Sequence, residues 1–364
     1  MNYSKIKPRQ PDWNNARQKA YEVLRTHNIQ DFPINILDVI NQYPNLKILT
    51  YKDLAKRKNL TISDVMTMYA SEDGFLSYDG RKDRYLLLYN DQKSVPERIY
   101  WTLAHEFGHY ILGHLKNSGQ SNLSNLSDGE YKIYEQETDY FVRYLINPPS
   151  IIQECKISSV SEIKKFFKVS HTAANNTLEY LRKFNIRHFT APDDIKNQLS
   201  NFILKVNHGK TCSSCDSFFV YKNSKYCPCC GNDNFNHFKK GNDFNMLYPG
   251  IKVDHKSRAK ICPHCNNEEL DYDGDFCNVC SSYLINKCGV VTEYDPFGEE
   301  YISSHSCEML LSGNARFCHK CGNPSTFLQN GYLHEWNHPK IEIVKDPPKV
   351  TGEPILVESH SPFY

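Results

Sequence analysis

The strongest candidate for chemistry is the pentapeptide His105-Glu106-Phe107-Gly108-His109. Residues four apart lie on one face of a helix, so two imidazoles at this spacing can bind one Zn²⁺ ion. Glu106 lies between them, close enough to act on a metal-bound water as general base. Apolar neighbours predict a buried helix over 96–115, with Pro96 in its first turn. The alternative is a pair of core histidines.

A second pentapeptide of this form is His334-Glu335-Trp336-Asn337-His338. Pro339 follows it directly and disfavours helical geometry at His338. No apolar helical run surrounds it, so we interpret it as a coincidence.

A catalytic zinc ion needs a third protein ligand and an open position for water. On a continuous helix, His114 would lie about 140° around from His109 and point away from the metal. The next predicted helix supplies acidic candidates instead. Glu135 is the favoured ligand, with Asp139 one turn later to hydrogen-bond a ligand imidazole. Glu137 is the alternative ligand, and a solvated acidic helix face is the alternative to both.

The cysteines predict further metal sites, because 13 of the 14 lie within residues 201–330. Two sets have the spacing C-x2-C-x11-C-x2-C, which is typical of structural zinc ribbons. The first set is Cys212, Cys215, Cys227 and Cys230, and the second is Cys262, Cys265, Cys277 and Cys280.

A third, less regular set consists of Cys318 and Cys321 with Cys288 and Cys307. His305 is the alternative to either member of the second pair. Two cysteines are left over: Cys229, a spare thiol inside the first ribbon, and Cys155, an isolated buried apolar residue.

Composition narrows the class of protein. The 364 residues are 40% hydrophobic, which excludes a disordered chain, and no run approaches the roughly 20 apolar residues of a membrane span. The N-terminus shows no apolar signal segment, so we expect a cytoplasmic protein without a membrane partner. Disulfides are rare there, which favours metal binding by the cysteines.

The charge pattern bears on partners of the ribbons. The net charge is +1, but residues 201–260 hold ten Lys or Arg against four Asp or Glu, and residues 261–330 hold three against ten. Each four-thiolate zinc site adds a formal charge of −2. The charge pattern of the zinc ribbons therefore favours recognition of a protein, with nucleic acid a less favoured partner. A purely structural extension is the other alternative.

The periodicity of the first half predicts an α+β fold. Helices are expected at 14–27, 36–40 and 131–146, and a strand pair at 74–80 and 84–90. Two short helices at 159–167 and 170–185, the second capped by Ser170, suggest a helix-turn-helix. The second helix offers as candidates for DNA contact only His171, Asn175, Asn176 and Arg182. Without a basic cluster, packing on the core is favoured over DNA binding.

This order of elements resembles the ImmA/IrrE family of metallo-endopeptidases over about residues 12–185. The family pattern is HE-x-GH, followed by E-x-E-A-[ND]-x-F-A-x-x-L-L-x-P. The chain matches it at His105, Glu106, Gly108, His109, Glu135, Glu137, Asp139, Phe141, Leu145 and Pro148. It departs at Thr138, Val142 and Ile146-Asn147, which are packing positions.

The resemblance implies a minimal zincin metallopeptidase core in which His105, His109 and Glu135 bind zinc and Glu106 is the general base. It also implies site-specific cleavage of a helix-turn-helix repressor or similar regulator, in stress response or mobile-element control. We expect one catalytic and two to three structural Zn²⁺ ions. The alternatives are a non-enzymatic DNA- or protein-binding regulator, and a zinc or redox sensor whose ribbons gate the protease.

The expected domains follow from these assignments. They are the metallopeptidase core (1–150), a helix-turn-helix-like segment (151–190), three small zinc ribbons (205–240, 255–285 and 286–330) and an extended tail (331–364).

Overall fold

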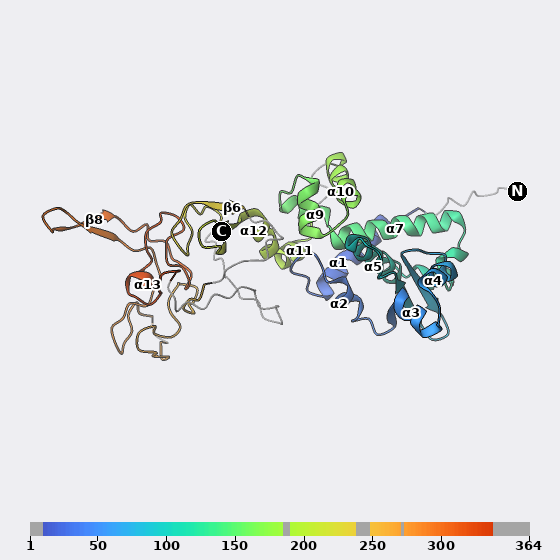
Figure 1. The fold of residues 1–364 in the computed structure, drawn as a ribbon, viewed down its shortest axis with the longest axis horizontal. Coiled ribbons are helices and arrows are strands. Elements are labelled where there is room, and N and C mark those ends of the chain that lie inside the picture. The colour runs from blue at the N-terminus through green and yellow to red at the C-terminus, as the bar shows by residue number, and fades with distance from the viewer. Residues whose placement is uncertain (1–9, 185–189, 238–247, 271–272, 338–364) are drawn as a thin grey trace. The chain divides into compact units, whose positions relative to one another are not determined.

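The computed structural model describes residues 10–184, 190–237, 248–270 and 273–337 (Figure 1). The chain forms two compact units, Met1–Asn207 and His208–Tyr364. Across the described residues, every helix is too short or too polar to cross a membrane. The larger part of the expected tail, 338–364, lies outside the described residues.

The first unit contains a small mixed sheet. Strand β3 (Arg84–Tyr89) lies in the middle, parallel to β1 (Leu46–Thr50) and antiparallel to β2 (Gly74–Asp79). The predicted strand pair is thus confirmed, while β1 was not foreseen. Leu87 and Leu88 in β3 are completely buried, so the central strand forms part of the core on both faces.

Two long helices position the candidate site. Helix α5 (Pro96–Ile111) packs on β2 and β3, and α7 (Asp128–Ile146) packs against α5 and against α1 (Trp13–Thr26) (Figure 1). Helices α5 and α7 approach closely at Gly108. A Cβ atom there would lie 2.9 Å from Cγ2 of Thr138 and 3.0 Å from Cδ1 of Phe141. The missing side chain therefore lets the acidic turn of α7 reach the histidines of α5.

The remaining helices of this unit are short. The helices predicted at 36–40, 159–167 and 170–185 are confirmed within a few residues, as are α1 and α7, which were predicted at 14–27 and 131–146. The other short helices were not foreseen. The short helices are α2 (Ile36–Ile40), α3 (Tyr51–Lys58), α4 (Ile62–Tyr69), α6 (His114–Ser118), η1 (Leu123–Asn125), α8 (Pro149–Glu154), α9 (Val160–Phe167), α10 (His171–Lys183), α11 (Asp193–Gln198) and α12 (Ser200–His208).

One predicted boundary is wrong. The helix expected over 96–115 ends at Ile111, because Gly113 adopts a left-handed conformation with φ of 70°. Glycine has no Cβ to oppose this conformation and commonly ends helices in this way. His114 therefore begins α6 instead of continuing α5, and its direction cannot be read from the periodicity of α5.

The helical pair α9–α10 packs on the core. Lys168 reverses the chain with φ of 51°, and the Ser170 hydroxyl accepts a hydrogen bond from the Ala173 N–H, which confirms the predicted N-cap. Asn147, which follows α7, donates a 2.8 Å hydrogen bond to the Thr177 hydroxyl. One side of α10 is thus bound to the core.

The second unit has little regular structure. Three short antiparallel strands form one sheet, a hairpin forms another, and one short helix follows. They are β4 (Gly209–Cys212), β5 (Phe218–Val220), β6 (Phe235–His237), β7 (Val291–Tyr294), β8 (Glu300–Ser304) and α13 (Thr326–Gln329). Its small cores are built around the cysteines themselves.

The three cysteine groups of this unit are packed together. Phe327 of α13 is completely buried in the core of the second group, where its N–H donates to Asn286. Next to the third group, the backbone N–H of Arg316 donates a 2.8 Å hydrogen bond to the carbonyl of Pro228 in the first group. The Arg316 side chain is only 1% exposed. The segment around the third group thus completes the packing of the other two.

Candidate metallopeptidase site

Three candidate ligands converge between α5 and α7. The Nε2 atoms of His105 and His109 lie 3.1 Å apart, and the Glu135 carboxylate oxygens lie 3.2 Å from the first and 3.3 Å from the second. A tetrahedral zinc ion with bonds of about 2.0–2.1 Å separates its ligand atoms by about 3.3 Å. The donor types and their spacing therefore fit zinc, with a fourth position left for water or substrate.

Glu106 lies beside this cluster. Its carboxylate accepts a hydrogen bond from the backbone of Leu76 in β2. Burial raises the pKa of Glu106 to about 7, with the charge of Glu135 adding to the effect and His105 opposing it. A buried carboxylate in this position can accept a proton from a water molecule bound between the ligands. Gly74 of β2 permits this proximity, because a Cβ there would lie 2.4 Å from Thr102 and 3.3 Å from Glu106.

The other side of the His105 ring faces Asp139. The distance from Nδ1 to the nearer carboxylate oxygen is 3.4 Å, and the Asp139 side chain is 58% exposed. A carboxylate in this position can orient the ring and favour the tautomer whose Nε2 is free to bind a metal.

The other side of the His109 ring faces His114. Their Nδ1 atoms are 2.9 Å apart, and Nε2 of His114 is 3.1 Å from the Glu137 carboxylate. The other oxygen of Glu137 accepts a 2.7 Å hydrogen bond from the Asp12 N–H. Since a carboxylate only accepts, Nε2 of His114 donates to it and Nδ1 of His114 accepts from His109. This series of hydrogen bonds leaves Nε2 of His109 unprotonated, as a metal ligand requires.

Thr138 completes this buried network. Its hydroxyl lies 3.2 Å from Nδ1 of His109 and 3.4 Å from Nδ1 of His114. The residue is completely buried, so this departure from the family pattern is more than a packing change. The sequence did not predict three partners of the site, which are His114, Thr138 and Asp12. Gly113 was the available signal for His114, since a glycine after an apolar helical run commonly ends the helix.

The two acidic candidates on α7 occupy different places. Glu135 reaches the histidine pair, and Tyr131 one turn earlier hydrogen-bonds the Glu135 carboxylate. Glu137 points into the core, where it is 4% exposed and held by His114. The structure thus brings Glu135, and not Glu137, to the imidazole pair.

The cysteines form three groups of four, and each group brings its sulfur atoms within 4.8 Å of one another. The groups are Cys212, Cys215, Cys227 and Cys230; Cys262, Cys265, Cys277 and Cys280; and Cys288, Cys307, Cys318 and Cys321. Close sulfur pairs are 3.4–3.6 Å apart, near the roughly 3.8 Å expected around one zinc ion.

The remaining candidates lie outside these groups. Cys307, and not His305, joins the third group, while Cys229 and Cys155 are buried outside all three. His334 to Asn337 are not helical, and Trp336 packs on the core of the first group. His338 lies outside the described residues.

Comparison with known families agrees with this geometry. Residues 56–179 match the IrrE N-terminal-like domain, Peptidase_M78. This segment holds the sheet strands β2 and β3, both site helices, α9 and most of α10. A comparison with curated proteins gave no match. Residues 56–179 of the first unit are therefore similar to the peptidase domain of the ImmA/IrrE family.

Proposed function

We propose that the protein is a zinc endopeptidase that cuts a regulatory protein, such as a helix-turn-helix repressor, at a specific site. The observation that carries the proposal is the convergence of His105, His109 and Glu135 beside Glu106. The repressor as substrate, and a role in transcriptional control or stress response, rest on the likeness to the ImmA/IrrE family. The free thiols support a location in the reducing cytoplasm.

The residues divide the work between binding and proton transfer. His105, His109 and Glu135 would hold the metal, which when bound supplies Lewis acidity toward the scissile carbonyl and the attacking water. Glu106 accepts the proton of that water and delivers it to the leaving amine. His114 and Asp139 position the two imidazoles from behind.

The test is co-expression of the protein with helix-turn-helix regulators encoded near it. We expect wild-type protein to shorten one of them, and Glu106→Gln to abolish the shortened product while zinc remains bound. Glu97→Gln, a substitution of the same kind on the same helix, should leave cleavage intact. A biological effect that survives Glu106→Gln would instead support a non-enzymatic regulator, and tight DNA binding at physiological salt would point the same way.

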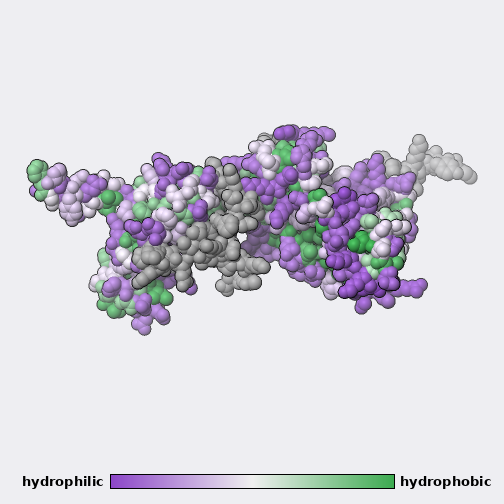
Figure 2. Space-filling model, viewed as in Figure 1, coloured by the Kyte–Doolittle hydropathy of each residue, from purple (hydrophilic) through white to green (hydrophobic). Residues whose placement is uncertain are grey.

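We further propose that the second unit recognises the protein partner through the β7–β8 hairpin. Phe297 at its turn is 91% exposed and Tyr294 is 71% exposed. Figure 2 shows hydrophobic side chains at the end of this hairpin. Residues 289–306 contain four acidic residues and no Lys or Arg, so a partner with a basic surface around an apolar pocket would be complementary.

The hairpin can be tested apart from the active site. Phe297→Ser should slow cleavage of the true substrate without changing stability or zinc content. Val279→Ser is the control, because Val279 is another highly exposed apolar side chain, 67% exposed in the second cysteine group. Equal cleavage by all three proteins would remove this part of the proposal.

A further inference from the structure

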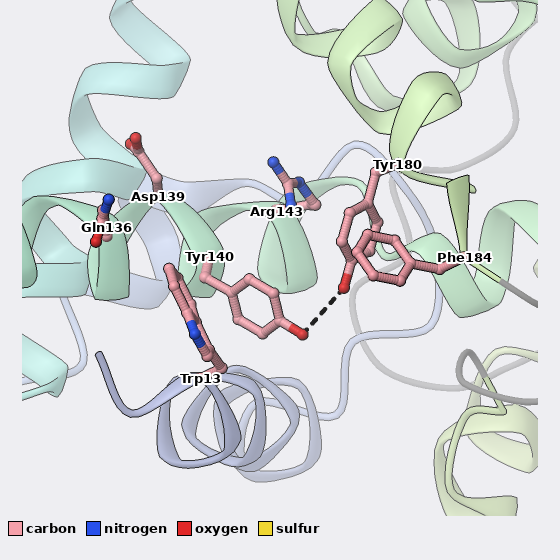
Figure 3. Close-up of a pocket in the computed structure, with 7 residues that line it drawn as sticks. All are labelled: Trp13, Gln136, Asp139, Tyr140, Arg143, Tyr180 and Phe184. Atoms are coloured by element: carbon pink, nitrogen blue, oxygen red, sulfur yellow. Dashed lines mark hydrogen bonds between the residues drawn. The ribbon is translucent and has the colours of Figure 1, made fainter. Parts of the chain in front are cut away.

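The first unit contains a pocket of about 580 Å³ whose lining includes Asp139, the neighbour of His105 (Figure 3). Three helices contribute to it: α1 through Trp13, α7 through Asp139, Tyr140 and Arg143, and α10 through Tyr180, with Phe184 just after its end. None of these residues has a role in the catalytic mechanism proposed above except Asp139.

Asp139 connects the pocket to the candidate active site. Its carboxylate lies 3.4 Å from His105 and also lines the pocket. Glu135, the third candidate ligand, precedes it by one turn of α7. A polypeptide whose scissile carbonyl lies at the metal can therefore place a nearby side chain in this pocket.

The lining of the pocket is mainly aromatic. The rings of Trp13 and Tyr140 have centroids 5.1 Å apart, and the hydroxyls of Tyr140 and Tyr180 are 3.1 Å apart (Figure 3). Trp13 and Phe184 remain 42% and 43% exposed. Aromatic walls with exposed faces favour a flat or large apolar guest, which gains both burial and ring contacts.

One cation gives the pocket a charge preference. The Arg143 guanidinium lies over the Tyr180 ring, 4.6 Å from its centroid. In the part of the chain that the structure describes, no carboxylate lies within ion-pair distance of Arg143. A guanidinium that lies over a ring can still offer its N–H groups to a carboxylate, which it binds with paired hydrogen bonds.

We propose that this pocket is a substrate subsite that takes an aromatic side chain of the polypeptide, with an acidic residue next to it paired to Arg143. This inference rests on the proposed endopeptidase function. The subsite would restrict cleavage to segments that combine an aromatic and an acidic residue within reach of the metal cluster.

The test uses short peptide hydroxamates, in which the hydroxamate binds zinc and the peptide carries the variable side chains. Two series place the peptide on either side of the zinc-binding group. Within each series, Phe is exchanged for Ala and a neighbouring Asp for Asn. Binding to zinc-loaded full-length protein is measured by calorimetry.

In one of the two series we expect Phe to bind roughly tenfold or more tighter than Ala, and Asp tighter than Asn. Arg143→Gln should remove the preference for Asp and keep that for Phe, whereas Phe184→Ala should weaken the preference for Phe. Arg182→Gln, an exposed arginine of α10 outside the pocket, should change neither.

The possible failures are distinct. If hydroxamates bind but show no side-chain preference in either series, the subsite is refuted and the proposed endopeptidase function stands. If no hydroxamate binds to the zinc-loaded protein, the proposed function fails, and the subsite fails with it.

Discussion

Nδ1 of His109 lies 2.9 Å from Nδ1 of His114, on the side of the ring opposite the candidate metal position. This contact extends through Glu137 to the Asp12 N–H, so two buried residues and one backbone group fix the orientation of one candidate ligand. The ligand geometry of α5 thus depends on α6, α7 and the segment before α1, of which only α6 is close to His109 in the sequence.

The first prediction concerns His114. The ring stacks on Tyr134 with centroids 4.2 Å apart, so His114→Phe preserves the shape but removes both nitrogens. Loss of an outer partner of a metal-bound imidazole typically costs 10–100-fold in metal affinity, and we expect about that loss at the catalytic site. Competition with a zinc chelator measures it. His114→Gln, whose amide can donate and accept, should recover part of the affinity; unchanged affinity in the Phe variant would contradict the prediction.

The second prediction concerns the contact between α5 and α7. Gly108→Ala should lower the free energy of unfolding of the first unit by up to about 2 kcal/mol. The added methyl group meets Thr138 and Phe141, which costs about 1–3 kcal/mol, and the better helix propensity of alanine offsets about 1 kcal/mol of that cost. Urea unfolding followed by circular dichroism measures the difference. Gly129→Ala on α7 meets nothing within 4 Å and should not destabilise; equal behaviour of the two variants would refute the steric argument.

The third prediction concerns the irregular cysteine group. With one zinc ion per complete ligand set, wild-type protein should bind about four, and Cys288→Ser about three. Native mass spectrometry counts the ions. Cys229→Ser removes a buried thiol that lies outside the groups and should keep the full count. A count that does not fall in Cys288→Ser would exclude this group as a metal site.

The fourth prediction concerns metal removal. The cores of the second unit include the cysteines themselves, so a strong chelator should unfold it. The first unit has a separate core, in which Phe107, Phe141 and Leu145 are completely buried, and should keep its helices. Limited proteolysis after chelation should therefore cut first within residues 208–337. Early cuts within α5 or α7 would show that the first unit also needs metal to fold.

Local sequence patterns were sufficient for much of this protein. The pentapeptide at 105–109 and its apolar neighbours predicted α5, because helical periodicity alone places two histidines on one face. Alternation of apolar residues predicted β2 and β3. The even spacing of the cysteine pairs predicted the first two groups of four, since a short segment can close such a site by itself.

Packing between distant segments decided the rest. Glu135 and Glu137 are two residues apart on one helix, and only the close crossing at Gly108 determines that the first reaches the histidines and the second the core. His114 contacts His109 because Gly113 ends α5, a reversal that helical periodicity cannot encode. The aromatic pocket draws residues from α1, α7 and α10, which share no local pattern. The sequence alone determined which side chains can do chemistry, and the tertiary structure determined their partners, because side-chain contacts depend on packing between segments far apart in the chain.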